Sequence, residues 1–161
     1  NAMSIQKKSA PAEQLLMFLD TLVSVRLSAS AGEDRISIIE HRMPYGSKTP
    51  MHIHRREDEV FHILEGTMRF RVDGKDTVAH AGQIVLAPKG IPHAFRVESV
   101  SGARCLTITT GGDFERMLRE MAKPATSAEL MPYVEPNLHV QQALAMACAR
   151  NGIDIIGGPI A

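Results

Sequence analysis

Four side chains in the middle of the sequence have the types and the spacing of a metal site. His52 and His54 lie two residues apart, and Glu59 follows five residues after His54. Residues two apart in an extended strand point to the same face, so both imidazoles lie on one side. A hairpin through the turn at 55–58 can fold the Glu59 carboxylate back toward them. His93, which follows a turn rich in proline and glycine, can add a third imidazole from a neighbouring strand.

Three neutral imidazoles and one carboxylate form a borderline-to-hard ligand set. Such a set favours one divalent transition metal (Fe, Mn, Ni, Co, Cu or Zn) over calcium or magnesium. Four protein ligands leave positions open on a six-coordinate ion for water, substrate or dioxygen. A closed structural zinc site would use cysteine thiolates, and none lies near this cluster. The residues therefore predict a reactive metal centre.

Short strand-like segments separated by turns must position these ligands. Residues 22–28 alternate apolar and polar side chains, which is typical of a half-buried strand. Asp73-Gly74 is a hairpin signal between two further strands. The predicted strands are 22–28, 35–42, 59–64, 67–72, 75–79, 84–87, 94–97 and 104–109. Many short strands at close spacing predict an all-β protein, an antiparallel sandwich or barrel.

The pattern changes after Gly111-Gly112, where apolar residues begin to recur at helical spacing. This spacing predicts a helix that Asp113 caps and that Pro124 ends. A second helix is predicted from Asn137 to about residue 150, with Asn151-Gly152 as its C-terminal cap. The β segments are therefore expected to carry a helical extension at their C-terminal end.

Two stretches around the ligands resemble the motifs of the cupin superfamily. Residues 46–66 read G-x5-H-x-H-x4-E-x6-G, and residues 82–93 read G-x5-P-x-G-x2-H. The resemblance implies a double-stranded β-helix, or jelly-roll barrel, with a metal inside its mouth. It carries the ligand roles over to His52, His54, Glu59 and His93. The asparagine that usually ends the second motif is Val97 here, so the polarity of that turn differs.

Further stretches, among them "FLDTLVSVRLSA", "PHAF", "TTGGDFERMLRE" and "NGIDIIGGP", resemble single-domain cupins described as quercetin-dioxygenase-like. The resemblance implies a metal-dependent dioxygenase-like oxidoreductase that acts on a small aromatic or enolic substrate. Glu59 would then be the catalytic residue, both metal ligand and general base. A homodimer is also expected. The alternatives are a metal-dependent isomerase or lyase, and a non-enzymatic barrel that binds a small ligand.

With this resemblance, the chain divides into three parts. Residues 1–13 are expected to be a tag remnant and a mobile arm, residues 14–112 the cupin β-barrel, and residues 113–161 a helical extension that packs on the barrel. Within the extension, Thr126 and Glu129 have the spacing of a capping box for a short turn.

Other side chains near the ligands receive less direct roles. Phe61 and Phe95 are core residues by type, and their nearness to the ligands makes them the predicted substrate-contacting side chains. Glu57 and Asp58 are rivals of Glu59 for the role of carboxylate ligand, but the spacing favours Glu59. They are expected instead to solvate the turn or to pair with Arg55 and Arg56.

The remaining histidines are assigned structural positions. His62 lies three residues after Glu59, so it should face outward, where a subunit contact is one role open to it. His41 is predicted to be partly buried with its hydrogen bonds satisfied, and surface positions are predicted for His80 and His139.

Composition excludes several classes of function. The 161 residues suit one domain, and 18 basic residues balance 18 acidic ones, which argues against nucleic-acid binding. Cys105 and Cys148 have no C-x-x-C spacing and are expected to be reduced, buried thiols. No apolar stretch is long enough for a membrane span, and residues 15–25 lack a signal-peptide cleavage site. A cytoplasmic protein without membrane or nucleic-acid partners is expected.

Overall fold

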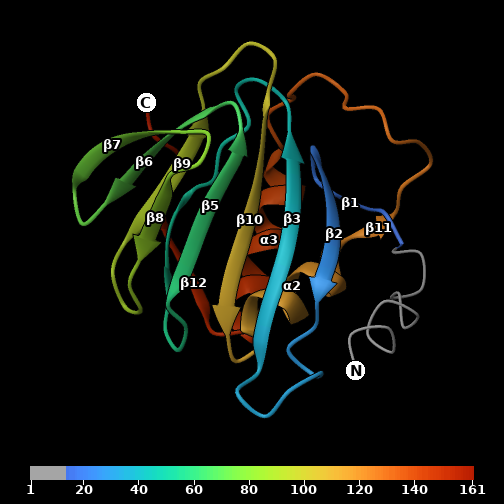
Figure 1. The fold of residues 1–161 in the computed structure, drawn as a ribbon, viewed down its shortest axis with the longest axis vertical. Coiled ribbons are helices and arrows are strands. Elements are labelled where there is room, and N and C mark those ends of the chain that lie inside the picture. Colours follow the sequence, from blue (N-terminus) through green and yellow to red (C-terminus); the bar gives the residue numbers. More distant parts are fainter. Residues whose placement is uncertain (1–13) are drawn as a thin grey trace, which may run out of the picture.

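The protein is built from two antiparallel sheets, and the computed structural model describes residues 14–161 (Figure 1). In spatial order, the seven-stranded sheet consists of β11 (Lys123–Pro124), β1 (Leu16–Phe18), β2 (Thr21–Leu27), β3 (Ile36–Met43), β10 (Ala103–Thr110), β5 (Glu59–Glu65) and β8 (Ile84–Ala87). The five-stranded sheet consists of β12 (Ile153–Gly157), β4 (Met51–His54), β9 (His93–Val97), β6 (Thr67–Val72) and β7 (Lys75–His80). This architecture confirms the predicted all-β jelly roll with a helical extension.

The hydrophobic core lies between the two sheets. Along β5, Glu59, Phe61 and Ile63 are buried, whereas the alternate residues Val60 and His62 are half-buried. The period of two therefore decides which side chains face inward. The ring of Phe61 meets that of Phe70 from β6 with 4.9 Å between ring centroids, which joins the sheets through aromatic contact.

Most of the predicted strands are present within one or two residues of their expected ends. The segments 67–72 and 84–87 form β6 and β8 as predicted. Asp73 and Gly74 have positive φ angles of 52° and 76°, the backbone of a two-residue hairpin turn between β6 and β7. The short strand β1 and the C-terminal strand β12 were not predicted. Because β12 pairs with β4, the C-terminal extension is helical only in part.

Two helices follow the last long strand, α2 (Asp113–Met121) and α3 (Leu138–Arg150). Asn137 caps α3 as predicted, since its side chain accepts a hydrogen bond from the backbone N–H of Val140 at 2.9 Å. The predicted C-terminal cap is also present, with Asn151 at the cap position and Gly152 at φ 73° after it.

Of three local predictions for this region, one is confirmed and two were wrong. Asp113 does not cap α2 with its side chain; its carboxylate instead pairs with Arg56 at 2.8 Å and with Arg116. Pro124 follows the end of α2 as predicted, since the helix stops at Met121 with Ala122 as its cap, and Pro124 belongs to β11. Residues 126–129 form no helix, and the backbone N–H of Glu129 donates to Ser127 Oγ rather than to Thr126. The expected arm at residues 1–13 lies outside the described residues.

The helices lie behind β10, β3 and β2 in the view of Figure 1. Met117 of α2 packs with Ala147 and Cys148 of α3 and with Ile153 of β12 in a second apolar cluster. This cluster joins the helices to the edge of the five-stranded sheet. Within residues 14–161, neither helix has the length and apolar character needed to cross a membrane.

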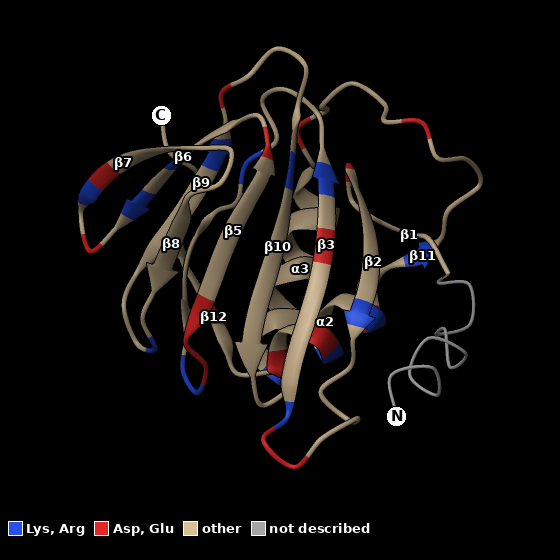
Figure 2. Cartoon of the chain, viewed as in Figure 1, with Lys and Arg blue, Asp and Glu red and all other residues tan. Residues whose placement is uncertain are grey.

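Acidic and basic residues are interspersed over the strands, the loops and α2 in Figure 2. Many of them pair locally. Asp76 of β7 accepts from Arg71 at 2.6 Å, and Glu98 accepts from Arg69 at 2.8 Å. Such pairs at the solvent-facing surface contribute little to stability, because water and salt screen the charges. These pairs make the outer surface polar, but they do not determine the fold of the protein.

Gly66, at the turn between β5 and β6, is expected to tolerate no side chain. Its φ is 84°, and a Cβ there would lie against the carbonyl oxygen of Gly102 and 2.7 Å from Ser99 Oγ. Gly74 has a similar φ of 76° but no atom within 4 Å of such a Cβ, which makes it a matched control. We expect Gly66→Ala to lower the free energy of unfolding by about 3 kcal/mol and Gly74→Ala by about 1 kcal/mol, measured by urea denaturation. Equal losses would contradict the steric explanation.

Candidate metal centre

The four predicted ligands converge in the interior of the barrel. His52 and His54 come from β4, His93 from β9 and Glu59 from β5 of the opposite sheet. His52 and His93 are direct partners in the β4–β9 register, with 4.3 Å between their ring centroids. All four residues are buried, and one ligand atom from each lies within 4.8 Å of the others. The structure thus brings together every residue that the motifs indicated.

Backbone carbonyls orient two of the imidazoles. His52 Nδ1 lies 2.8 Å from the carbonyl oxygen of Pro50, and His93 Nδ1 lies 3.1 Å from that of Ile91. Because a carbonyl only accepts, each Nδ1 must carry the proton and donate it. The Nε2 lone pair of each ring is then free for another partner. This arrangement is typical of metal-binding histidines.

His54 and Glu59 interact strongly. His54 Nε2 lies 2.7 Å from Glu59 Oε2. Burial works to lower the pKa of His54, but the carboxylates of Glu59 and Glu57 outweigh it and raise this pKa to about 10. For Glu59, burial works to raise the pKa, but His54 above all lowers it to about 2. In the metal-free protein, a proton on His54 therefore compensates the buried carboxylate.

The residues fit a divalent transition metal. His93 Nε2 is buried and has no hydrogen-bond partner among the described residues, and it lies 3.9 Å from Glu59 Oε1. Burial lowers the pKa of His93, and burial and His93 lower that of His52 to about 3, so both rings are neutral at pH 7. Neutral imidazoles and an anionic carboxylate are the forms that bind such a metal.

Metal binding is expected to release a proton at neutral pH. His54 carries a proton up to a pKa of about 10 in the metal-free protein, and an imidazole must lose that proton to become a ligand. We therefore expect roughly one proton per Zn²⁺ bound at pH 7. Titration of the metal-free protein in weak buffer with a pH indicator measures it. No release at pH 7 would contradict a protonated His54.

Glu57 has a role that the sequence interpretation missed. It was expected to solvate the turn or to pair with arginine, but only 1 % of it is exposed. Its carboxylate accepts the backbone N–H of Asp113 at 2.8 Å and of Phe114 at 3.1 Å, so it caps α2 from another element. Glu57 Oε2 also lies 3.8 Å from His54 Nδ1. The one available signal was its two-residue spacing from Glu59, which is typical of a shared face.

Asp58 and the arginines near it also differ from the expected turn pairs. Asp58 is exposed and accepts the backbone N–H of Lys89 at 2.8 Å. Arg55 lies 3.6 Å from Asp154, and Arg56 pairs with Asp113. The acidic residues of the turn therefore bond to backbone, while its arginines bond to acids far away in the sequence.

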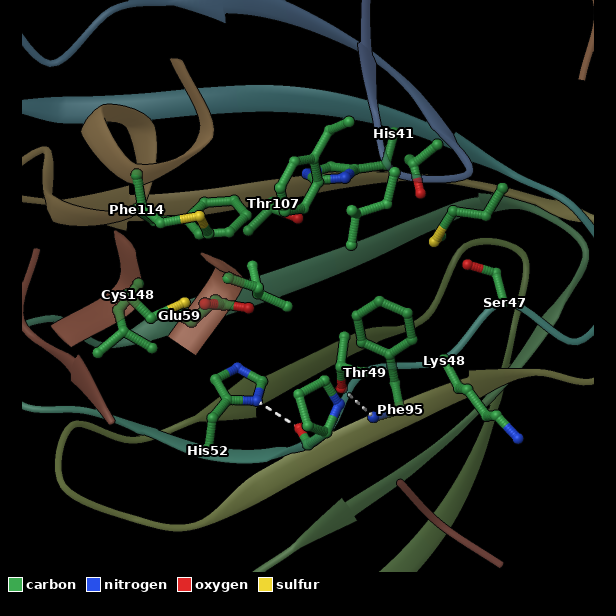
Figure 3. A pocket seen from close by; sticks show the side chains of 18 of the residues that line it. His41, Ser47, Lys48, Thr49, His52, Glu59, Phe95, Thr107, Phe114 and Cys148 are labelled. Atoms are coloured by element: carbon green, nitrogen blue, oxygen red, sulfur yellow. Dashed lines mark hydrogen bonds between the residues drawn. The ribbon is translucent and has the colours of Figure 1, made fainter. Parts of the chain in front are cut away.

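A mostly apolar cavity leads to the cluster (Figure 3). Both predicted substrate-contacting residues, Phe61 and Phe95, line this cavity. Met117 of α2 and Leu144 of α3 line it as well, so the helical extension supplies part of the wall. A small organic molecule can therefore approach the cluster between aromatic and aliphatic side chains.

The other histidines are placed apart from the ligands. His62 faces outward on β5, and His80 and His139 are exposed, as predicted. His41 differs from its prediction: it is 7 % exposed, it lines the cavity, and its Nε2 has no hydrogen-bond partner among the described residues. A histidine with satisfied hydrogen bonds was expected there.

Both cysteines are buried, as predicted. Burial raises the pKa of Cys105 and of Cys148 to about 12. Neither thiol is therefore a nucleophile at neutral pH.

A jelly-roll barrel with an internal cluster of three histidines and one glutamate defines a class of β-barrel suited to holding a metal. Residues 39–109 match the family model described as "Cupin domain". This part of the chain is a cupin domain, which confirms the resemblance seen in the motifs.

Curated relatives match only in part. The chain is 27% identical over 88 residues to quercetin 2,3-dioxygenase of Bacillus subtilis (strain 168), which covers 55% of this chain and 26% of that protein. It is 31% identical over 64 residues to an uncharacterized protein of Methanocaldococcus jannaschii, which covers 40% of this chain and 50% of that one. The chain thus spans between a quarter and a half of the length of these relatives.

Solved structures share the fold. A protein of Thermotoga maritima described as "a predicted oxalate decarboxylase" has a TM-score of 0.53 at 24% identity, covering 56% of this chain and 79% of that chain. The cupin domain of Cnp3 from Schizosaccharomyces pombe has a TM-score of 0.53 at 14% identity, covering 71% and 78%. At these identities the likeness shows the jelly-roll fold alone.

The buried His41 is expected to weaken the protein in acid. Burial lowers its pKa from 6.5 to about 4, although Glu59 and Glu40 oppose the shift. Between these values the unfolded chain takes up a proton that the folded chain excludes, so stability falls as pH falls. In the His41→Phe variant, the fall in the free energy of unfolding between pH 6.5 and 4 should be smaller by up to about 3 kcal/mol. Urea denaturation across that range measures it, and parallel curves for both proteins would contradict a neutral His41.

Proposed function

We propose that this protein is a metal-dependent oxidoreductase of the dioxygenase type that acts on a small aromatic or enolic molecule. The observation that carries the proposal is the buried cluster of His52, His54, Glu59 and His93 beside an open, mostly apolar cavity. The partial similarity to quercetin 2,3-dioxygenase supports the same class of reaction. A divalent transition metal supplies Lewis acidity toward a substrate oxygen and redox chemistry toward dioxygen.

The protein side chains hold the reacting groups and control protons. Backbone carbonyls fix the rings of His52 and His93, so their Nε2 lone pairs point to one place without rearrangement. Glu59 is held as the anion, which suits a ligand, but a carboxylate with a pKa of about 2 takes up a proton weakly. Its further role as general base therefore depends on His54 losing its proton first, as metal binding requires.

The cavity walls position the substrate and exclude water. Phe61 and Phe95 meet at 5.8 Å between centroids with their planes at 72°, so they form an aromatic corner. A flat ring can stack on one of them while an oxygen atom reaches the cluster. Apolar walls also strengthen electrostatic interactions inside the site, because water is displaced from it.

Oxygen consumption tests the proposal. The protein is loaded separately with Fe²⁺, Mn²⁺ and Ni²⁺ and is mixed without oxygen with a flavonol, a 1,3-diketone or a catechol. Oxygen is then added and its uptake is followed with an electrode. Uptake with at least one of these compounds is expected. Turnover without oxygen would instead indicate an isomerase or a lyase, and tight binding without turnover under any metal would indicate a binding protein.

A homodimer is part of the proposal. The strand β8 lies at the edge of the seven-stranded sheet and exposes Ile84 (64 %) and Leu86 (50 %). An edge strand with exposed apolar side chains is suited to pairing with a second copy. Light scattering after gel filtration at micromolar concentration is expected to give twice the mass of the chain, and a monomeric mass would refute the dimer.

A further inference from the structure

His41 lines the cavity that leads to the metal cluster, and its side chain carries a buried polar atom without a partner among the described residues. It lies on β3, where no residue of the cluster lies. Its side chain is buried, and Nε2 has no hydrogen-bond partner among the described residues. Buried polar atoms without partners are uncommon in proteins, and each one calls for a ligand, a water molecule or a functional role.

The unpaired atoms of the described chain gather around one place. Apart from Glu59 Oε2, which lies 2.7 Å from His54 Nε2, five buried side-chain atoms lack a partner, and two of them, His54 Nδ1 and His93 Nε2, belong to the cluster. A third, Thr109 Oγ1, is on the residue paired with Glu59 in the β10–β5 register. The remaining two are His41 Nε2 and Asp20 Oδ2, both on residues that line the cavity. Of these two, His41 is the more deeply buried.

The orientation of the His41 ring is set by stacking. The imidazole lies parallel to the ring of Phe114, with centroids 5.8 Å apart and 21° between the planes, as Figure 3 shows above Glu59. Phe114 also meets the ring of His54 at 6.0 Å. The backbone N–H of Phe114 is held by Glu57. The Phe114 ring therefore contacts both His41 and His54 and links His41 to the metal cluster.

The chemistry of His41 selects the kind of group it can bind. Burial lowers its pKa to about 4, so the ring is neutral at physiological pH and attracts no anion. A neutral imidazole nitrogen either donates or accepts, according to the tautomer. A hydroxyl group can pair with both tautomers, whereas a carbonyl pairs only with N–H and an ammonium group only with the lone pair.

We propose that His41 Nε2 binds a hydroxyl group of the substrate, at a distance from the oxygen atom that meets the metal cluster. The preferred substrates are then ring compounds that carry at least two oxygen functions, one for the cluster and one hydroxyl for His41. This inference rests on the proposed function for the first of these contacts. His41 is thus a specificity-determining residue, because loss of the hydroxyl leaves a buried nitrogen unpaired in the complex.

Matched ligands test the inference without turnover. The protein is loaded with redox-inactive Zn²⁺, and dissociation constants are measured by fluorescence for 3-hydroxyflavone, 3,7-dihydroxyflavone and 3,4′-dihydroxyflavone. The last two add one hydroxyl at different distances from the shared hydroxyketone. We expect at least one of them to bind the unaltered protein about 10-fold or more tighter than 3-hydroxyflavone. In the His41→Phe variant, which keeps an aromatic ring against Phe114, the affinities for that compound and for 3-hydroxyflavone should differ by no more than about 2-fold.

Two further variants complete the design. His62→Phe makes the same change on the outward face of β5, so the hydroxylated compound should still bind as much more tightly than 3-hydroxyflavone as it does to the unaltered protein. His41→Gln places an amide at position 41 and should retain part of this difference in affinity. The melting temperature of metal-free His41→Phe should not fall, since the change removes an unpaired buried nitrogen. A lower melting temperature with an unchanged ligand preference would assign His41 a structural role and overturn the inference.

The other outcomes separate this inference from the proposed function. If 3-hydroxyflavone binds and neither added hydroxyl improves binding, the inference is wrong while the metal site stands. If a hydroxyl improves binding through His41 but no metal form consumes oxygen, the inference stands and the dioxygenase proposal fails. If no compound of the series binds the unaltered protein, the inference is overturned for hydroxylated ring compounds.

Discussion

Replacing His93 with alanine is expected to lower the affinity for Zn²⁺ or Co²⁺ by about 1,000-fold or more. The change removes one of four converging ligands, and the cluster contains no other described histidine that could replace it. Loss of an outer partner of a metal ligand already costs 10–100-fold, so loss of a ligand itself must cost more. Competition with a chromophoric chelator measures the affinity, and the visible spectrum of the Co²⁺ form reports the coordination number.

The control for this experiment is His80→Ala, which removes an exposed imidazole at the end of β7. It should leave both the affinity and the spectrum unchanged. Urea denaturation of the metal-free proteins checks that the His93 variant is folded. A folded His93→Ala protein that binds metal as tightly as the unaltered chain would remove the basis of the proposed function.

Replacing Glu57 with alanine is expected to lower the free energy of unfolding by about 4 kcal/mol. The variant leaves the N–H groups of Asp113 and Phe114 without their acceptor at the start of α2, and it removes a negative charge from the positive end of the helix dipole. Because Phe114 touches both His54 and His41, the shape of the cavity should change as well. Urea denaturation of the metal-free protein measures the loss.

Two variants sharpen this prediction. Glu57→Gln keeps one carbonyl acceptor of the same shape and should cost about half as much. Asp58→Ala removes the neighbouring, exposed carboxylate, which accepts a single backbone hydrogen bond, and should cost at most about 1 kcal/mol. If Glu57→Ala costs no more than Asp58→Ala, then Glu57 does not hold α2 in place.

Local patterns determined most of the barrel and the ligands. Strand alternation such as that of 67–72, and the turn at Asp73-Gly74, depend on neighbouring residues, so they can be read before any fold is known. The ligands of β4 share a face for the same reason. The motif spacing added Glu59 and His93, because fixed turns between short strands leave little freedom in where these side chains arrive.

Only the tertiary structure shows which residues surround the metal cluster and which partners they have. Glu57 caps a helix that begins 56 residues later in the chain, and no local rule gives that pairing. β12 finds its partner β4 across a still longer separation, with Ile153 paired to His54, so its short apolar segment carried no clear signal. His41 was expected to have its hydrogen bonds satisfied, but its Nε2 has no partner among the described residues, and its ring lies against that of Phe114 from α2. Periodicity reveals which face a residue occupies, whereas only long-range packing determines what meets it there.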